Sequence, residues 1–468
     1  CQRDASFADC HCMPRVLDMP KAGLPLPADT RLANEIEAIN KTLADADTLG
    51  SIMKFSLSLA AREWVASLEE ENETAQLVLA LTDKYAALIA NPPYMGRGNM
   101  NSTLTAYLDK NYPIAKQDLF ATFMQMMIER TQDKGRCAFI TMESWMFLSS
   151  FEKLRHYIID NYYISSLGHF GWHIIGIAFG TAMTVIEKNK DYGRIGEYSY
   201  LTIDDIDRSK NVPFVFPKKD NGRFAHVSQQ NFEKIPGCPI GYWVSEKMIK
   251  AFDNPTIREI TISDGQTKTG DNNKFLREFW EISSFKVGKD KKWIFYAKGG
   301  GFRRWYGNLT TTINWSEEAR GFYRKDKIAR ILPEYLWWKR GITWSYICSA
   351  IPSFRILPEQ AIFDVGGSSV FFKDENDINN VLAFLNTGLT YYILKLFNPT
   401  INYQVADIRA LPYPKTLLGN KEILSITRQN ISISRADWDA HETSWDFQEN
   451  ELVRLSMEQG EGSHRLSD

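Results

Sequence analysis

The chain has 468 residues, too many for one hydrophobic core, and so predicts two or three domains. Hydrophobic residues make up 44% of it, charged residues 24% and aromatic residues 13%, which excludes intrinsic disorder, collagen and coiled coil. No apolar run reaches the roughly 18 residues of a membrane-spanning helix. The formal net charge of −2 argues neither for nor against a polyanionic partner.

The amino-terminal residues predict neither a secretory signal nor a metal site. The chain starts with Cys1 and lacks a basic segment followed by an apolar one, so we interpret it as part of a longer chain. Cys10, His11 and Cys12 form a cluster, but a structural zinc site needs a second pair of ligands. We therefore predict no metal, and free thiols in a reducing cytoplasm.

Apolar spacing predicts secondary structure from residue 57 onward. A helix is expected over 57–79, with its acidic residues on a solvated face. The run 85–90 predicts a buried strand that stops at two prolines, which cannot continue a ladder. Further helices and strands then alternate, which predicts βαβ units and a mostly parallel sheet. These are helices over 118–130 and 151–161 and strands over 135–141 and 182–187.

After about residue 200 the pattern changes to shorter, aromatic-rich runs broken by Gly and Pro. This change predicts a domain boundary near residues 195–240. We divide the chain into domains over 1–200 and 201–415 and a carboxyl-terminal extension over 416–468.

The tetrapeptide Asn91-Pro92-Pro93-Tyr94 carries the most specific chemical signal. It follows a predicted strand, and open parallel sheets bind ligands at the carboxyl ends of their strands. The Asn91 side-chain carbonyl and the next proline carbonyl can accept both hydrogens of an exocyclic amine, while Tyr94 stacks on its ring. This pattern favours methylation of an amino group on a planar base that has left the helix stack. The structural alternative is a strand end at a Pro-Pro turn.

The tetrapeptide resembles the catalytic signature of amino-group methyltransferases that use S-adenosylmethionine, the adenine-N6 branch in particular. Longer motifs resemble the adenine-specific methyltransferase of BREX phage-defence systems, in register from about residue 40 to the end. These motifs lie at 91–96, 116–120, 135–141, 144–150, 235–243, 269–272, 298–308 and 437–447.

The resemblance implies an α/β fold: a Rossmann-like methyltransferase sheet, incomplete at its amino-terminal side, then a mixed α/β target-recognition domain. It implies catalytic roles for Asn91, Pro92, Pro93 and Tyr94, with S-adenosyl-L-methionine as cofactor. Asp118 and Phe120 are expected to flank the cofactor, and we favour Phe179 as the second aromatic against the extruded base. A helix-start Asp and core aromatics are the structural alternatives for these three residues. We assign no general base, because water can take the proton.

One departure from the family pattern concerns the cofactor. Such enzymes place a glycine-rich loop upstream of the Asn-Pro-Pro-Tyr strand, whereas residues 1–90 contain only Gly23 and Gly50. The resemblance therefore implies that this loop lies on a preceding segment, and that the chain is an internal fragment.

Basic and aromatic residues concentrate in the second predicted domain. Residues 265–345 contain 17 Lys and Arg against 8 Asp and Glu, and seven of the 13 tryptophans. Such interleaving suits a surface that follows phosphates and contacts base edges. The structural alternatives to DNA contact are a hairpin turn with exposed arginines at 298–305 and solvated surface charge at Lys339 and Arg340. The DNA-binding candidates are Lys274, Arg277, Lys298, Arg303, Arg304, Trp305, Lys339 and Arg340.

Together these features predict S-adenosylmethionine-dependent N6-methylation of adenine in a specific double-stranded DNA sequence by base flipping, as the host-marking component of a phage-defence system. The resemblance implies double-stranded DNA as partner, with other phage-defence subunits or a phage inhibitor protein as further candidates. Three alternatives stay open. They are a noncatalytic DNA-recognition subunit, a methyltransferase fused to a restriction nuclease, and methylation of RNA or of a protein glutamine, although the basic aromatic domain argues against a protein substrate.

Overall fold

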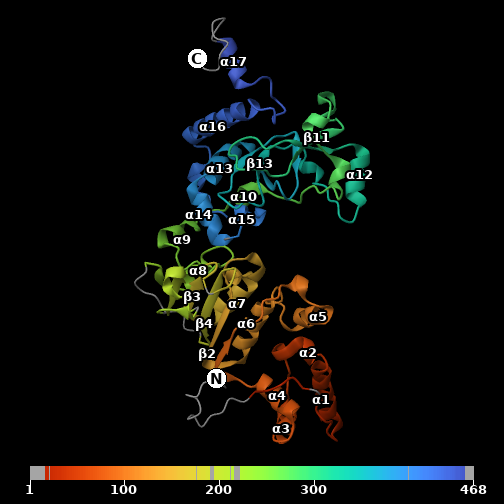
Figure 1. Ribbon diagram of the computed structural model, residues 1–468, viewed down its shortest axis with the longest axis vertical. Helices are drawn as coiled ribbons and strands as arrows, with labels where there is room; N and C mark the ends of the chain where they lie inside the picture. Colours follow the sequence, from red (N-terminus) through yellow and green to blue (C-terminus); the bar gives the residue numbers. More distant parts are fainter. Residues whose placement is uncertain are drawn as a thin grey trace. The chain divides into compact units, whose positions relative to one another are not determined.

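A computed structural model describes residues 16–20, 22–174, 176–189, 194–210, 212–215, 222–398 and 400–458. The chain divides into two compact units, Cys1–Trp243 and Val244–Asp468, called here the first and the second unit (Figure 1). Within the described ranges, no helix combines the length and apolarity needed to cross a membrane.

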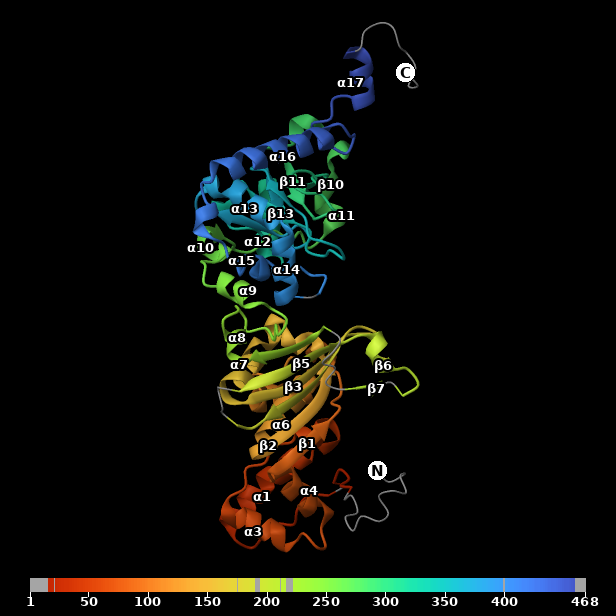
Figure 2. The ribbon, with the colours of Figure 1, turned by 90° about the vertical axis from the view of Figure 1, so that its left-hand side faces the viewer.

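The first unit is built on a six-stranded sheet with the order β1-β2-β4-β3-β5-β8 (Figure 2). Two neighbouring pairs are parallel, β1 with β2 and β3 with β5, and the other three are antiparallel. The strands are β1 (Tyr85–Ala90), β2 (Thr131–Met142), β3 (Tyr163–Phe170), β4 (Thr181–Glu187), β5 (Ile195–Leu201) and β8 (Phe224–Ser228). A separate pair joins β6 (Ile206–Asp207) and β7 (Val212–Pro213).

The α/β fold class is confirmed, but the prediction of a mostly parallel sheet was wrong. Only ten residues, 171–180, connect β3 to β4. A parallel crossover needs a dozen or more residues, so these strands pair antiparallel and the sheet becomes mixed. The prediction that β1 is buried was also wrong. This strand lies at the edge of the sheet, and its Ile89 is 84% exposed.

Helices of the first unit confirm part of the sequence pattern. The two expected over 118–130 and 151–161 are α6 and α7, and both share a core with the sheet. The single helix expected over 57–79 is two helices, because the Asn72 side chain accepts the Ala75 N–H at 2.9 Å and starts α4. The helices are α1 (Thr30–Leu43), α2 (Ala46–Leu49), α3 (Leu59–Ser67), α4 (Glu73–Thr82), α5 (Ser102–Asn111), α6 (Leu119–Arg130), α7 (Glu152–Asn161) and α8 (Gln230–Glu233).

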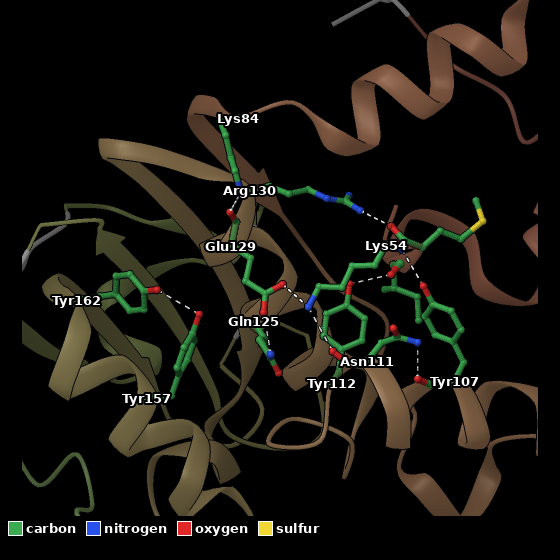
Figure 3. Close-up of polar contacts among 12 residues, drawn as sticks. Lys54, Lys84, Tyr107, Asn111, Tyr112, Gln125, Glu129, Arg130, Tyr157 and Tyr162 are labelled. Atoms are coloured by element: carbon green, nitrogen blue, oxygen red, sulfur yellow. Dashed lines mark hydrogen bonds and ion pairs between the residues drawn. The ribbon is translucent and has the colours of Figure 1, made fainter. Parts of the chain in front are cut away.

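A polar cluster fixes the segment before α3 to α5 and α6 (Figure 3). Arg130, at the end of α6, donates to the carbonyls of Ser51 at 2.9 Å and Met53 at 2.7 Å. The Lys54 ammonium pairs with Glu129 at 2.6 Å, and the backbone N–H of Lys54 donates to the Tyr107 hydroxyl at 2.7 Å. The two Arg130 bonds satisfy the carbonyls of Ser51, in a short 3-10 helix (Gly50–Ile52), and of Met53, directly after it.

The second unit contains two four-stranded sheets, of order β10-β12-β11-β15 and β14-β13-β16-β9. Their strands are β9 (Thr261–Ile262), β10 (Leu276–Glu278), β11 (Trp293–Ala297), β12 (Thr311–Asn314), β13 (Gly341–Trp344), β14 (Phe354–Leu357), β15 (Ala361–Phe363) and β16 (Ser369–Phe372). The helices are α9 (Glu246–Ala251), α10 (Ile257–Ile260), α11 (Asn272–Phe275), α12 (Glu317–Lys325), α13 (Ile378–Leu385), α14 (Gly388–Phe397), α15 (Val405–Arg409), α16 (Lys421–Asp439) and α17 (Glu451–Glu458).

The division between the units falls later than the domain limit proposed at residue 200. β8 adds a strand to the sheet of the first unit by pairing with β5, so residues up to Trp243 belong with that unit. The extension proposed over 416–468 lies with the second unit, where α16 packs against α13. The functional roles of these domains stay predictions.

Candidate functional site

The loops that follow β1 and β2 and the loop that precedes β4 lie at one edge of the first unit's sheet. Thr181, the first residue of β4, pairs with Met142 at the end of β2 and with Phe170 at the end of β3, so β4 begins where β2 and β3 end. The same edge holds the ends of β1 and β5, because they run parallel to β2 and β3, respectively. The tetrapeptide 91–94, Glu143 and the residues just before β4 therefore meet at the carboxyl edge. This is the position at which open α/β sheets bind ligands.

The tetrapeptide is held rigidly while its first side chain stays available. The Tyr94 hydroxyl donates to the Ile140 carbonyl at 3.2 Å, and burial raises the pKa of this phenol. Pro92 is buried, whereas Pro93 is exposed. Asn91 is exposed, and its amide has no hydrogen-bond partner among the residues that the structure describes. Its carbonyl oxygen is therefore available to accept a hydrogen bond from a ligand.

Asp118 ties this loop to α6. Its Oδ1 accepts the Met95 N–H at 3.1 Å and the Phe120 N–H at 3.2 Å, so it caps the helix. Burial raises the pKa of this carboxyl, and the backbone hydrogen bonds partly offset that effect. Phe120 has 0% exposure and packs against the rings of Tyr94 and Phe151. The structure gives both residues structural roles, and their contact with a cofactor stays a prediction.

Phe179 lies where the sequence placed it, next to the tetrapeptide. Its ring centroid is 5.5 Å from that of Tyr94, with the ring planes at 74°. This is direct edge-to-face contact, which leaves no space for a base stacked between the two rings. The prediction that Phe179 sandwiches a base therefore requires its ring to move.

The sequence interpretation missed a pair at the same edge, formed by the buried His169 and the half-buried Glu143. His169, 6% exposed, places Nε2 2.6 Å from Glu143 Oε2 and Nδ1 3.1 Å from the Tyr242 hydroxyl. Because the carboxylate can only accept, Nε2 carries a proton. Glu143 also donates its backbone N–H to the Gly180 carbonyl, at 3.0 Å. An acidic residue directly after a strand was the available signal, but its partner is 26 residues away.

The DNA-binding candidates of the second unit do not form one cluster. Arg277 and Lys298 line a cavity of about 570 Å³, together with Asn272 and Asn273. Arg340 lines another cavity, of about 490 Å³, with the rings of Tyr306, Trp438 and Trp445. The ammonium of Lys274 lies over the rings of Phe275 and Phe322, and Lys339 is half-buried with no ion-pair partner among the described residues.

The arginines after the three glycines differ in their surroundings. Arg303 pairs with Asp437 of α16 and stacks on Trp438 at 4.9 Å, so its charge is already compensated. The guanidinium of Arg304 lies 5.4 Å from the Phe302 ring centroid and has no acidic partner in the described chain. Trp305 has a φ of 72°, a strained value for a large side chain. It is held by backbone bonds to Phe354 and Ile356, both 2.9 Å.

Metal ligands are not gathered in the described ranges, where no group of three His, Cys, Asp or Glu could hold an ion. The cluster Cys10, His11 and Cys12 lies outside the described residues. Cys137 and Cys238 are buried free thiols, and burial raises the pKa of each to about 12.

Comparisons with known proteins agree with the resemblance inferred from the motifs. A family model described as Eco57I restriction-modification methylase matches residues 30–174. The adenine-specific methyltransferase PglX of Lacticaseibacillus casei (strain Zhang) is 33% identical over 449 residues, which cover 86% of this chain and 37% of PglX. The adenine-specific methyltransferase BrxX of Escherichia coli O9:H4 (strain HS) is 32% identical over 457 residues, covering 91% of this chain and 37% of BrxX.

Among solved structures, the Type IIL restriction-modification enzyme MmeI in complex with DNA aligns with a TM-score of 0.47 and 13% identity, over 89% of this chain and 57% of MmeI. The similarity to adenine-specific methyltransferases is thus confirmed by the curated relatives, and the chain spans 37% of the length of each.

Proposed function

We propose that this chain forms the amine-binding loop and the DNA-recognition unit of an adenine-specific DNA methyltransferase. The reaction is transfer of a methyl group from S-adenosylmethionine to N6 of a flipped-out adenine in a specific double-stranded sequence, and it marks host DNA in a phage-defence system. The observation that carries the proposal is Asn91, which is exposed at the carboxyl edge of the sheet and has no side-chain partner in the described ranges. The identity of 33% to an adenine-specific methyltransferase supports it.

The chemistry assigned to this chain is to hold the amine. The Asn91 side-chain carbonyl and the Pro92 carbonyl accept the two amine hydrogens, which directs the nitrogen lone pair away from both oxygens. Tyr94 is fixed by its bond to Ile140, and in this proposal its ring stacks on the base after the Phe179 ring has moved away. The proton released after transfer goes to water, so the proposal gives no catalytic role to the buried His169.

The two residues predicted to flank the cofactor are both engaged within the protein. Phe120 has no exposed surface, and Asp118 Oδ1 is engaged by two backbone amides. We therefore derive no step through S-adenosylmethionine. What supports this methyl donor is the similarity to a methylase family over residues 30–174.

Substitution of Asn91 tests the proposal. In the longest natural chain that contains this sequence, Asn91→Ala should abolish transfer of a labelled methyl group from S-adenosylmethionine to DNA. DNA affinity should stay within a few-fold, because the change removes an amine acceptor and no phosphate contact. Asn99→Ala is the matched control, an exposed amide eight residues further along the chain. Normal methylation by the Asn91 variant would remove the assignment.

A further inference from the structure

The loop after β11, residues 298–302, contains two positions whose backbone conformation favours glycine. We call this segment the glycine loop. Gly299 has a φ of +90° and Gly300 a φ of +115°, values that side chains rarely reach. A Cβ on Gly299 would lie 2.5 Å from the Gly366 carbonyl oxygen. The backbone therefore requires glycine at positions 299 and 300, whereas Gly301 has open space around its Cα.

Each glycine carbonyl is engaged by a side chain of the same unit. Arg355 Nη2 donates to the Gly299 carbonyl, Ser345 Oγ to that of Gly300 and Asn308 Nδ2 to that of Gly301, each at 2.8 Å. These donors come from residues 7 to 56 positions away along the chain. The orientation of three consecutive peptide groups is thereby fixed.

That orientation determines where the amides point. In a trans peptide the carbonyl of one residue and the N–H of the next point in opposite directions. The N–H groups of Gly300, Gly301 and Phe302 therefore point away from the side chains that hold the carbonyls. All three residues are exposed, and none of these amides has an acceptor within the described chain. Successive unpaired amides of this kind bind anions.

A buried positive charge lies behind the loop. Arg355 is 1% exposed, its Nε and Nη1 have no hydrogen-bond partner, and no acidic side chain of the described ranges pairs with it. Burial lowers the pKa of this guanidinium to about 10. Removing an unpaired charge from water is costly, and a nearby anion would offset that cost. Arg304, two residues after the glycine loop, adds a second charge that has no acidic partner among the described residues.

We propose that the glycine loop binds a phosphate group of the DNA backbone, with the amides of Gly300, Gly301 and Phe302 as donors and Arg355 as a positioning residue. The inference rests on the proposed function, which makes DNA the ligand, and it names the contact that the second unit makes. Arg355 fixes the peptide group between Gly299 and Gly300 by binding its carbonyl. Its positive charge therefore lies on the side of the loop opposite to the anion, which it does not touch. Such a contact sets the register of the protein on DNA and carries no sequence information.

Arg355→Met separates this role from a purely structural one. Binding of a duplex of arbitrary sequence should weaken roughly tenfold at low salt. The plot of log affinity against log salt should lose about one unit of slope. The thermal midpoint without DNA should change little, because the variant removes a buried unpaired charge together with one hydrogen bond to the Gly299 carbonyl. A lowered midpoint with an unchanged salt slope would make Arg355 structural and overturn the proposal.

Two further variants keep the test decisive. Arg320→Met makes the same change in net charge at a guanidinium that stacks on Trp337 at 5.3 Å, and it should leave the slope unaltered. Equal losses in both arginine variants would show a general charge effect and overturn the site. Ser345→Ala frees the Gly300 carbonyl without touching the buried charge, and it should weaken binding roughly fivefold. Unchanged affinity in that variant would also overturn the proposal.

The readout is independent of methyl transfer. Methylation by Asn91→Ala would remove the catalytic proposal and leave the Arg355 result standing. If Asn91→Ala loses methylation but Arg355→Met keeps the salt slope, the catalytic proposal stands and the phosphate site alone is contradicted. Inorganic phosphate gives a second probe, because it should raise the thermal midpoint of the unsubstituted chain more than that of Arg355→Met. An equal rise in both would contradict the site.

Discussion

His169 Nε2 lies 2.6 Å from Glu143 Oε2, in a hydrogen bond that joins the penultimate residue of β3 to the first residue after β2. The bond crosses β4, which lies between these strands, at the edge that carries the tetrapeptide. It connects the carboxyl ends of two strands directly. Glu143 also contacts the residue before β4, because its backbone N–H donates to the Gly180 carbonyl at 3.0 Å.

Removal of this bond should destabilise the first unit. We expect His169→Gln to lower the free energy of unfolding by about 2 kcal/mol, because the Glu143 carboxylate loses its partner in a half-buried site. Urea denaturation measures the change. His173→Gln is the control, an exposed histidine whose side chain has no partner among the described residues. Equal stability of the two variants would contradict the importance of the bond.

A substitution at Gly180 tests how closely the Glu143 side chain packs against the residue before β4. A Cβ at this position would lie 2.1 Å from the Glu143 carboxyl carbon. Gly180→Ala should therefore destabilise the chain by about 1–3 kcal/mol, and part of that loss should disappear when it is combined with Glu143→Ala. Gly98→Ala, where nothing lies within 4 Å, should change the stability by less than about 0.5 kcal/mol. Strictly additive effects of the Gly180 and Glu143 substitutions would argue against the contact.

Asp118 should make stability depend on pH. Burial raises the pKa of its carboxyl above the ordinary value of 3.8, so the folded chain holds this proton more tightly than the unfolded chain. The contribution of Asp118 to stability is therefore greatest below pH 3.8 and falls as the pH rises through the raised value. Asp118→Asn keeps an acceptor for the cap, so its stability relative to the unsubstituted chain should increase from pH 4 to pH 7.

Asp118→Ala provides the comparison, because it removes the acceptor altogether. It should lose about 1 kcal/mol through the missing cap, as measured by thermal unfolding over the same pH range. A constant difference between the Asn variant and the unsubstituted chain at every pH would show that Asp118 does not titrate in this way.

Arg130 should control local opening of the segment that it holds (Figure 3). Arg130→Ala removes the donors to the carbonyls of Ser51 and Met53. Amide hydrogen exchange should then accelerate in residues 50–54 and leave β4 unchanged. Arg62→Ala breaks an exposed pair with Asp83 and should have little effect. Unchanged exchange in residues 50–54 would show that other contacts hold this segment without Arg130.

The sequence alone determined those features whose physical cause is local. Two consecutive prolines must end a strand, so the position of the tetrapeptide after β1 could be predicted. Asp118 before an apolar run of period 3.6 predicted the start of α6. Three consecutive glycines indicated a backbone that needs unusual dihedral angles, as Gly299 and Gly300 now display. Each of these features depends on neighbours within a few residues.

Tertiary structure decided everything that depends on partners far along the chain. The direction of β3 and β4 follows from a connection too short for a crossover, and a period of two in the sequence is the same for parallel and antiparallel strands. His169 was a histidine of no stated role until the fold placed Glu143 beside it. Arg355 had no assigned role in the sequence, and only the fold brings its guanidinium to the Gly299 carbonyl, 56 residues away. Long-range packing, which no local pattern encodes, turned these residues into candidate parts of a site.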